Sequence, residues 1–159
     1  MPLSFFRNRA PVRPRDNQRA RLYRAEHEAF GLPPQSAWPC LTFPAVRHYV
    51  HGVLAAAWFR DEFGIFPEVR IKDGRGTRHA YSAYDLERHS VLFSFPRWAR
   101  STPVLLHEIG HAATLRCHGM VAAHGPEFAA VYLRLVQHYL GIDAHTRLDA
   151  AFMKHRVRH

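Results

Sequence analysis

A short motif in the second half of the chain, "LLHEIGHAAT" at residues 105–114, restricts the fold more than any other feature. The surrounding sequence predicts a helix over residues 101–119, with Pro103 in its first turn and a glycine at its end. Residues four positions apart lie on the same face of a helix, so His107 and His111 would direct their rings at a common point. We therefore expect a domain built around a helix that presents two imidazoles on one face.

The residue types in this motif indicate a metal site. Two histidines at this spacing, with Glu108 after the first, form the HExxH pattern, in which the histidines bind zinc and the glutamate is a general base. A catalytic zinc ion takes three protein ligands and leaves a fourth position to water. The alternative is a solvated pair of histidines beside a helical glutamate, in a chain that has 13 histidines. The helix around the motif and a sheet before it favour the metal site.

A third ligand has to come from outside the motif. The extended pattern HExxHxxGxxH fails, because Cys117 stands where its last histidine would be and His118 is one residue out of register. Two candidates follow in "AAHGPEF", namely the imidazole of His124 and the carboxylate of Glu127. The connecting chain is long enough to bring His124 back to the motif helix. Glu127, in the first turn of the next helix, fits better as a residue that stabilises the helix end or orients a ligand.

The combination "HEIGHAATL…HGPEF" resembles the metal-binding segment of the SprT-like zinc metalloproteases, the family that includes Spartan. The resemblance implies a zincin-like fold, a Zn²⁺ ion held by His107, His111 and His124, and Glu108 as the catalytic base. A longer part of the chain, roughly residues 15–140, is similar to an uncharacterised family of actinobacterial metallohydrolases. That similarity implies a metal-dependent hydrolase and names no substrate.

Helical periodicity predicts three more helices in the domain. The first covers about residues 16–31, and Asp16 or Asn17 can cap it; the others cover residues 42–64 and 126–141. Together with the motif helix, they should supply most of the core.

Three short β-rich runs, "EVRIK", "TRHAYSAY" and "HSVLFSF", precede the motif helix and predict a small antiparallel sheet. The Asp-Gly of "DGRG" is a hairpin signal that would join the first two runs. In the third run, residues 91–95 could form an edge strand that pairs with an extended substrate, or an interior strand. The sequence predicts an α+β, zincin-like domain over residues 16–141.

Two residues near the motif have expected packing roles. Gly110, inside the motif, costs about 1 kcal/mol relative to alanine in an ordinary helix, and close approach of another backbone would justify it. Phe128, one turn into the next helix, is expected to anchor the loop that carries His124.

Composition bounds the partners and the compartment. Residues 1–15 read as a disordered basic arm and residues 142–159 as a basic tail with at most one short helix. Lys and Arg outnumber Asp and Glu by 22 to 13, so contact with nucleic acid through a basic surface is conceivable, although no known binding motif accompanies the charge. Only two cysteines occur, without a CxxC pair, which argues against a cysteine zinc site. We expect a cytoplasmic protein that does not enter membranes.

The leading functional interpretation is a zinc metallopeptidase, in which Glu108 activates a water molecule against the peptide bonds of a protein or peptide substrate. One alternative is a DNA-associated binding protein with a structural zinc site. Another is a DNA-dependent protease of the SprT-like kind.

Overall fold

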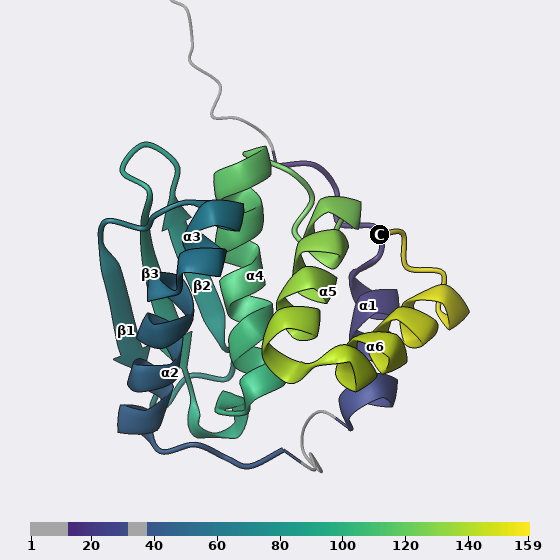
Figure 1. Cartoon of the computed structure of the whole chain (residues 1–159), viewed down its shortest axis with the longest axis horizontal. Coiled ribbons are helices and arrows are strands. Elements are labelled where there is room, and N and C mark those ends of the chain that lie inside the picture. The colour runs from purple at the N-terminus through teal and green to yellow at the C-terminus, as the bar shows by residue number, and fades with distance from the viewer. Residues whose placement is uncertain (1–12, 32–37) are drawn as a thin grey trace, which may run out of the picture.

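The computed structural model describes residues 13–31 and 38–159, so most of the predicted basic arm lies outside the described residues. It has the expected α+β class, with helices gathered on both sides of a central helix and a small sheet at one side (Figure 1). The elements in chain order are α1 (Arg19–Phe30), α2 (Phe43–Ala55), α3 (Ala57–Phe63), β1 (Val69–Asp73), β2 (Tyr81–Asp85), β3 (Ser90–Phe95), η1 (Arg97–Ala99), α4 (Thr102–His118), α5 (Pro126–Leu140) and α6 (Ile142–Lys154).

The sheet is mixed and its strand order is β1-β3-β2, so the prediction of an antiparallel sheet was wrong. β3 pairs parallel with β1 and antiparallel with β2. The reason lies in burial: β3 is the most apolar run and buries Val91, Phe93 and Phe95, so it takes the centre. The interpretation of residues 91–95 as an edge strand is therefore wrong, and β2 is the strand at the edge beside α4.

The expected hairpin between the first two strands is also wrong, because β1 and β2 do not pair within the described sheet. The Asp-Gly pair serves a different purpose. The amide of Gly74 donates to the carbonyl of Phe95 at 3.2 Å, and a Cβ on this glycine would lie 2.5 Å from the backbone nitrogen of Pro96. Gly74 thus lets the end of β1 approach the end of β3 closely.

The helix predicted over residues 42–64 is divided into α2 and α3 at Ala56, whose backbone is extended with ψ 137°. Thr42, at the predicted start of this helix, caps α2, its hydroxyl accepting from the amide of Ala45 at 3.4 Å. The bend turns Phe59 and Phe63 into the core. We attribute the break at Ala56 to the packing of these two rings, because no Pro or Gly stands at this position.

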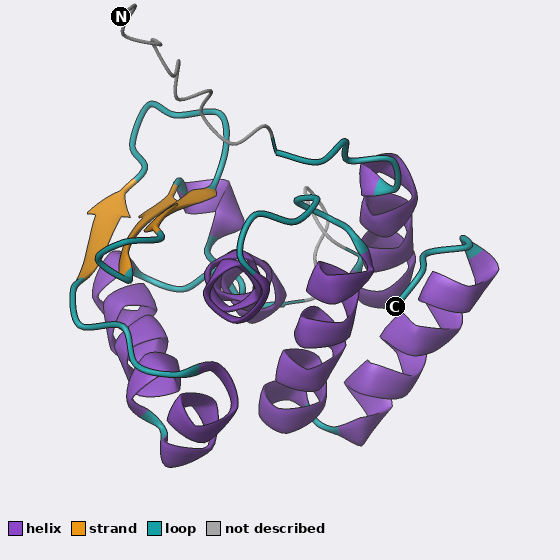
Figure 2. Ribbon diagram, turned by 90° about the horizontal axis from the view of Figure 1, so that it is seen from above, coloured by secondary structure: helices purple, strands orange, loops and turns teal. Residues whose placement is uncertain are grey.

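α4 is the central element, and Figure 2 looks along it with the sheet on one side and α5, α1 and α6 on the other. It is buried along most of its length. At Gly110 a Cβ would lie 3.2 Å from Cε2 of Phe128, so a side chain, and not the expected second backbone, comes close to this glycine.

Residues 142–159, expected as a basic tail, contain α6, which packs against α1 and α5. Leu148 and Phe152 of α6 are fully buried. Glu28 of α1 bonds Lys154 and His155 at 2.8 Å each. The last helix therefore holds α1 against the rest of the domain. Within the described ranges, no helix has the length and apolar character needed to cross a membrane.

Candidate metal centre

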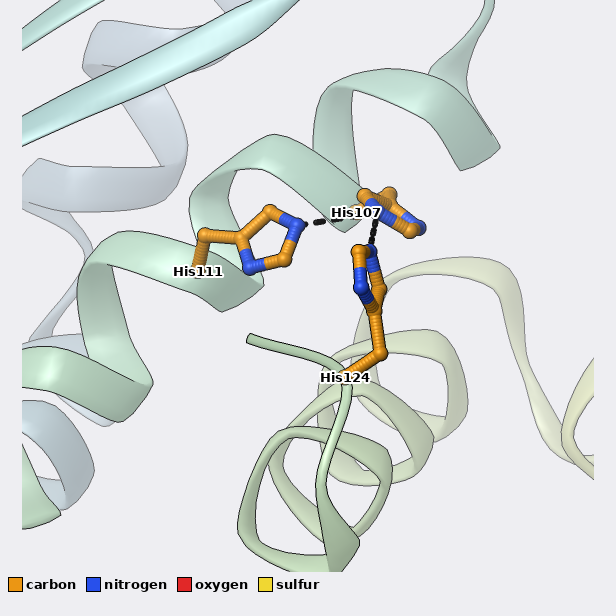
Figure 3. A group of neighbouring side chains, drawn as sticks. All are labelled: His107, His111 and His124. Atoms are coloured by element: carbon orange, nitrogen blue, oxygen red, sulfur yellow. Dashed lines mark hydrogen bonds between the residues drawn. The ribbon is translucent and has the colours of Figure 1, made fainter. Parts of the chain in front are cut away.

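The structure brings together the three histidines that the sequence singled out (Figure 3). His107 and His111 lie one turn apart on α4, and His124 comes from the loop between α4 and α5. The Nε2 atom of His107 lies 3.1 Å from that of His111 and 3.3 Å from that of His124. The ligand nitrogens of all three lie within 4.8 Å of one another, and two of the three rings are buried.

These separations suit a tetrahedral metal. Two nitrogens bound to one zinc ion at about 2.0–2.1 Å lie about 3.3–3.4 Å apart. The two contacts made by His107 match that value, at 3.1 and 3.3 Å. Small movements of His111 and His124 would complete the set.

Each ring also has an oxygen partner away from the cluster. Nδ1 of His107 lies 2.7 Å from Oε1 of Glu26, and Nδ1 of His124 lies 2.7 Å from Oδ2 of Asp16. The ring of His111 is hydrogen-bonded to the backbone of Ala123. Partners of this kind orient metal-binding histidines and fix their tautomer.

The tautomers have a consequence for the centre of the cluster. An ionised carboxylate only accepts, so Nδ1 of His107 and of His124 must donate, and in neutral rings both Nε2 atoms then carry a bare lone pair. These two atoms face each other at 3.3 Å without a proton to share. A cation bound between them removes the conflict, as does a proton on His107, whose pKa is raised.

Burial keeps two of the rings neutral, the form that binds metal. Burial, aided by the neighbouring rings, lowers the pKa of His111 well below its ordinary value. Burial and His107 lower the pKa of His124 to about 4, although Asp16 opposes the shift. For His107, burial alone would lower the pKa, but the Glu26 carboxylate outweighs burial and the net shift is upward.

Glu108 is buried beside His107, and burial raises the pKa of its carboxyl, while His107 and hydrogen bonds from Ser82 oppose the shift. Both the hydroxyl and the backbone of Ser82 bond this carboxylate, so β2 lies directly beside it. Glu108 and His107 together line a cavity of about 510 Å³. Arg19, Tyr23, His79 and Trp98 also line it.

Phe128 lies against the cluster, as expected for the anchor of this loop. Its ring stacks on His111 with centroids 4.3 Å apart, and its centroid is 4.8 Å from that of His107 and 5.3 Å from that of His124. Tyr132, expected as core, is fully buried, and its hydroxyl donates to the carbonyl of Pro103 at 3.1 Å. Aromatic packing thus holds the three rings from the α5 side.

Glu127 does not belong to the cluster of potential ligands. It lies in the first turn of α5, as predicted, and a Cβ on Gly125 would lie 3.0 Å from its Oε2. Its side chain therefore fills space beside the loop that carries His124.

The outer partners Glu26, Asp16 and Ser82 were not predicted from the sequence. Glu26 falls on the buried face of α1 together with Leu22, Ala25 and Ala29, so a charged residue within an apolar stripe was the available signal. Asp16 was expected as a helix cap, but Gln18 is the N-cap of α1 and Asp16 instead bonds His124. Nothing in the sequence indicated Ser82, which depends on the strand order.

Comparisons of the chain with protein-family models, with curated proteins and with solved structures gave no match.

Proposed function

We propose that the protein is a zinc-dependent metallohydrolase, and that it acts as a peptidase of the HExxH kind. The observation that carries the proposal is the convergence of His107, His111 and His124, with the Nε2 atoms of His107 and His124 3.3 Å apart. Imidazole ligands suit zinc among the divalent metals, and three protein ligands leave one position of a tetrahedral ion open for chemistry.

Zn²⁺, when bound there, would polarise a carbonyl group and lower the pKa of water at the open position. Glu108 faces the same cavity as His107 and is the residue placed to accept a proton from the attacking water. A carboxyl whose pKa is raised by burial can later return that proton to the leaving amine. Tyr23, Val104 and Trp98 form an apolar part of the cavity wall.

The strand order supports a peptide as substrate. β2 is an edge strand, and through Ser82 its backbone bonds Glu108. His79 and Ala80, the two residues before β2, line the cavity that holds Glu108. An extended peptide that added to this edge would bring a backbone carbonyl towards His107 and Glu108. β2 thus takes the substrate role considered from the sequence for residues 91–95.

The decisive experiment compares Glu108→Gln with the wild type for zinc content and for hydrolysis of a peptide library. We expect one zinc ion per chain in both proteins and a loss of hydrolysis in the variant of about 10²-fold or more, since the general base is removed. Glu127→Gln is the matched control, because it neutralises a glutamate beside the same loop, outside the cluster. An unchanged hydrolysis rate in Glu108→Gln would refute the mechanism.

Nucleic-acid binding is a second candidate function, and one observation favours it. A cavity of about 830 Å³ is lined by Trp38 and Trp98 together with Arg75, Arg97 and Arg100. Tryptophans can stack on bases and arginines can contact phosphates. This candidate predicts salt-dependent binding of single-stranded DNA that survives Glu108→Gln and weakens in Arg97→Ala.

A further inference from the structure

The segment before and within α1 reaches the metal centre at two points. Asp16 bonds His124, 108 positions away in the sequence, and Glu26 bonds His107, 81 positions away. We propose that Asp16 and Glu26 are positioning residues for the metal site, and that a bound ion and residues 13–26 stabilise each other's placement. The inference rests on the proposed function, because it requires a metal ion held by the three histidines.

Glu26 is placed where packing alone would favour an apolar side chain. It is 4% exposed and occupies the buried face of α1. A buried carboxylate is costly unless charged or polar groups surround it. Here its Oε1 accepts a hydrogen bond from Nδ1 of His107 at 2.7 Å. The specific contribution of the carboxylate is therefore to the orientation and tautomer of the His107 ring.

Asp16 fastens the chain to the other side of the site. Its Oδ2 accepts from Nδ1 of His124, while its Oδ1 is buried without a hydrogen-bond partner among the described residues. The contact with His124 is thus what directs this side chain. Three residues earlier, Nε of Arg13 donates to the carbonyl of Val121 at 3.3 Å, in the loop that carries His124. Residues 13–16 therefore hold this loop from outside.

The charges of Asp16 and Glu26 also favour a role in metal binding. Three neutral imidazoles leave the full charge of a divalent ion uncompensated by its ligands. Asp16 and Glu26 place two negative charges one ring away from it. A carboxylate behind a ligating imidazole also makes the ring a better donor to the metal. By linkage, an ion that strengthens these contacts must favour the docked position of the segment.

The same helix provides controls that do not touch the cluster. Glu28 bonds Lys154 and His155, and Gln18 exchanges two hydrogen bonds of 3.0 Å with the backbone of Arg158. Both contacts join α1 to the C-terminal segment, and both lie away from His107, His111 and His124. Glu28→Gln therefore removes one negative charge from α1 and leaves the ligand partners in place.

The first experiment measures zinc affinity by competition with a chelating dye, for the wild type, Asp16→Asn, Glu26→Gln and Glu28→Gln. We expect zinc affinity to fall about 10- to 100-fold in Asp16→Asn and in Glu26→Gln, and to change less than about twofold in Glu28→Gln. The absorption spectrum of the Co²⁺-substituted protein should change in the first two variants and not in the control. Circular dichroism of each metal-free variant reports whether it is folded.

The second experiment needs no variant in the proposed positions. Hydrogen exchange of the wild type is compared with and without zinc, and we expect zinc to slow exchange in residues 13–26 more than in α6. This protection should disappear in His124→Ala, which keeps Asp16 but loses the ring that it bonds. Equal protection of the two segments would overturn the coupling.

The outcomes separate this inference from the proposed function. A wild type that binds no zinc removes the proposed function and, with it, this inference. A wild type that binds zinc in a manner dependent on His124, while folded Asp16→Asn and Glu26→Gln keep wild-type affinity, overturns the positioning role alone. Reduced thermal stability of the metal-free variants with unchanged zinc affinity also overturns the positioning role, because it shows that the two carboxylates are purely structural.

Discussion

The inner and outer parts of the candidate site are built in different ways. The three histidines come from one stretch of 18 residues, 107–124, on a helix and the loop after it. Their outer partners Asp16 and Glu26 come from the opposite end of the chain, and Ser82, which contacts Glu108, comes from the sheet. Groups close in sequence present the potential ligands, while distant groups orient them.

Only the outer contacts depend on the folded domain. A helix alone places His107 and His111 on one face, whatever surrounds it. The contacts of Asp16 and Glu26 exist only once α1 is docked beside the site, where it also packs against α6. The inner part should therefore decide whether metal binds, and the outer part how tightly it binds.

Removal of an inner ligand should give the largest effect. His124→Ala leaves two ligands, and since structural zinc contributes about 10–16 kcal/mol in small domains, the loss of one of three should weaken binding by roughly 1,000-fold. Titration with zinc against a chelator measures this. The matched control is His138→Ala, which removes a histidine of α5 that stacks on Trp58, with centroids 3.8 Å apart, and is not part of the cluster. Full zinc affinity in His124→Ala would show that His124 is not a ligand, and that the histidines of α4 bind the ion without it.

Packing behind the inner ligands should have the next largest effect. Phe128→Ala deletes a fully buried ring that contacts all three histidines, so we expect it to lower the free energy of unfolding by about 3–5 kcal/mol and to weaken zinc binding as well. Urea denaturation and zinc titration measure the two effects.

Phe152→Ala is the control for this prediction, because it deletes a fully buried ring in α6, away from the cluster. It should cost a similar free energy of unfolding and leave zinc affinity within a few-fold of the wild type. Equal losses of zinc affinity in both variants would show that Phe128 acts through global stability alone.

The predictability of the site from the sequence follows the same division. The pair on α4 was predicted because helical spacing fixes it, and His124 because the chain after α4 can reach back. Glu26 and Asp16 were missed because an interaction across 81 or 108 positions has no local pattern. The position of Glu26 within the apolar stripe of α1 indicates that its carboxylate is buried, but the sequence does not show which residue it contacts.

The fold shows a similar limit. Helix boundaries such as Thr42, Gly31 and Gly119 were predicted because caps act locally. The strand order was not, since the hydrophobic run of β3 decides which strand becomes central only when all three meet. The break at Ala56 likewise follows from packing of Phe59 and Phe63, and the sequence contains no breaker there.

Gly110 tests how closely α5 packs behind the ligands. In Gly110→Ala, the new Cβ would lie 3.2 Å from Phe128 and 3.7 Å from Leu135. Overpacking costs about 1–3 kcal/mol, and the gain in helix propensity returns up to about 1, so the free energy of unfolding should fall by about 1 kcal/mol. Gly52→Ala is the control, because a Cβ at Gly52 in α2 meets nothing within 4 Å, and it should stabilise the protein. A stabilised Gly110→Ala would show that the α4–α5 contact is looser than described.

The smallest expected effect concerns the contact between Ser82 and Glu108, the proposed general base. Ser82→Ala removes a hydroxyl that bonds Glu108 and opposes the upward shift of its pKa, while the backbone contact remains. Loss of this bond should raise the pKa of Glu108 further, so that the carboxylate becomes protonated at a higher pH and the acid limb of the kcat/KM profile moves to higher pH. Since one net hydrogen bond contributes about 1 kcal/mol, the rate near the optimum should fall less than tenfold. Ser90→Ala, on the neighbouring strand β3, is the control and should leave the kcat/KM profile unchanged. A shift of the acid limb to lower pH in Ser82→Ala would show that the hydroxyl does not stabilise the ionised carboxylate of Glu108. In that case β2 would contribute to the site through its backbone alone.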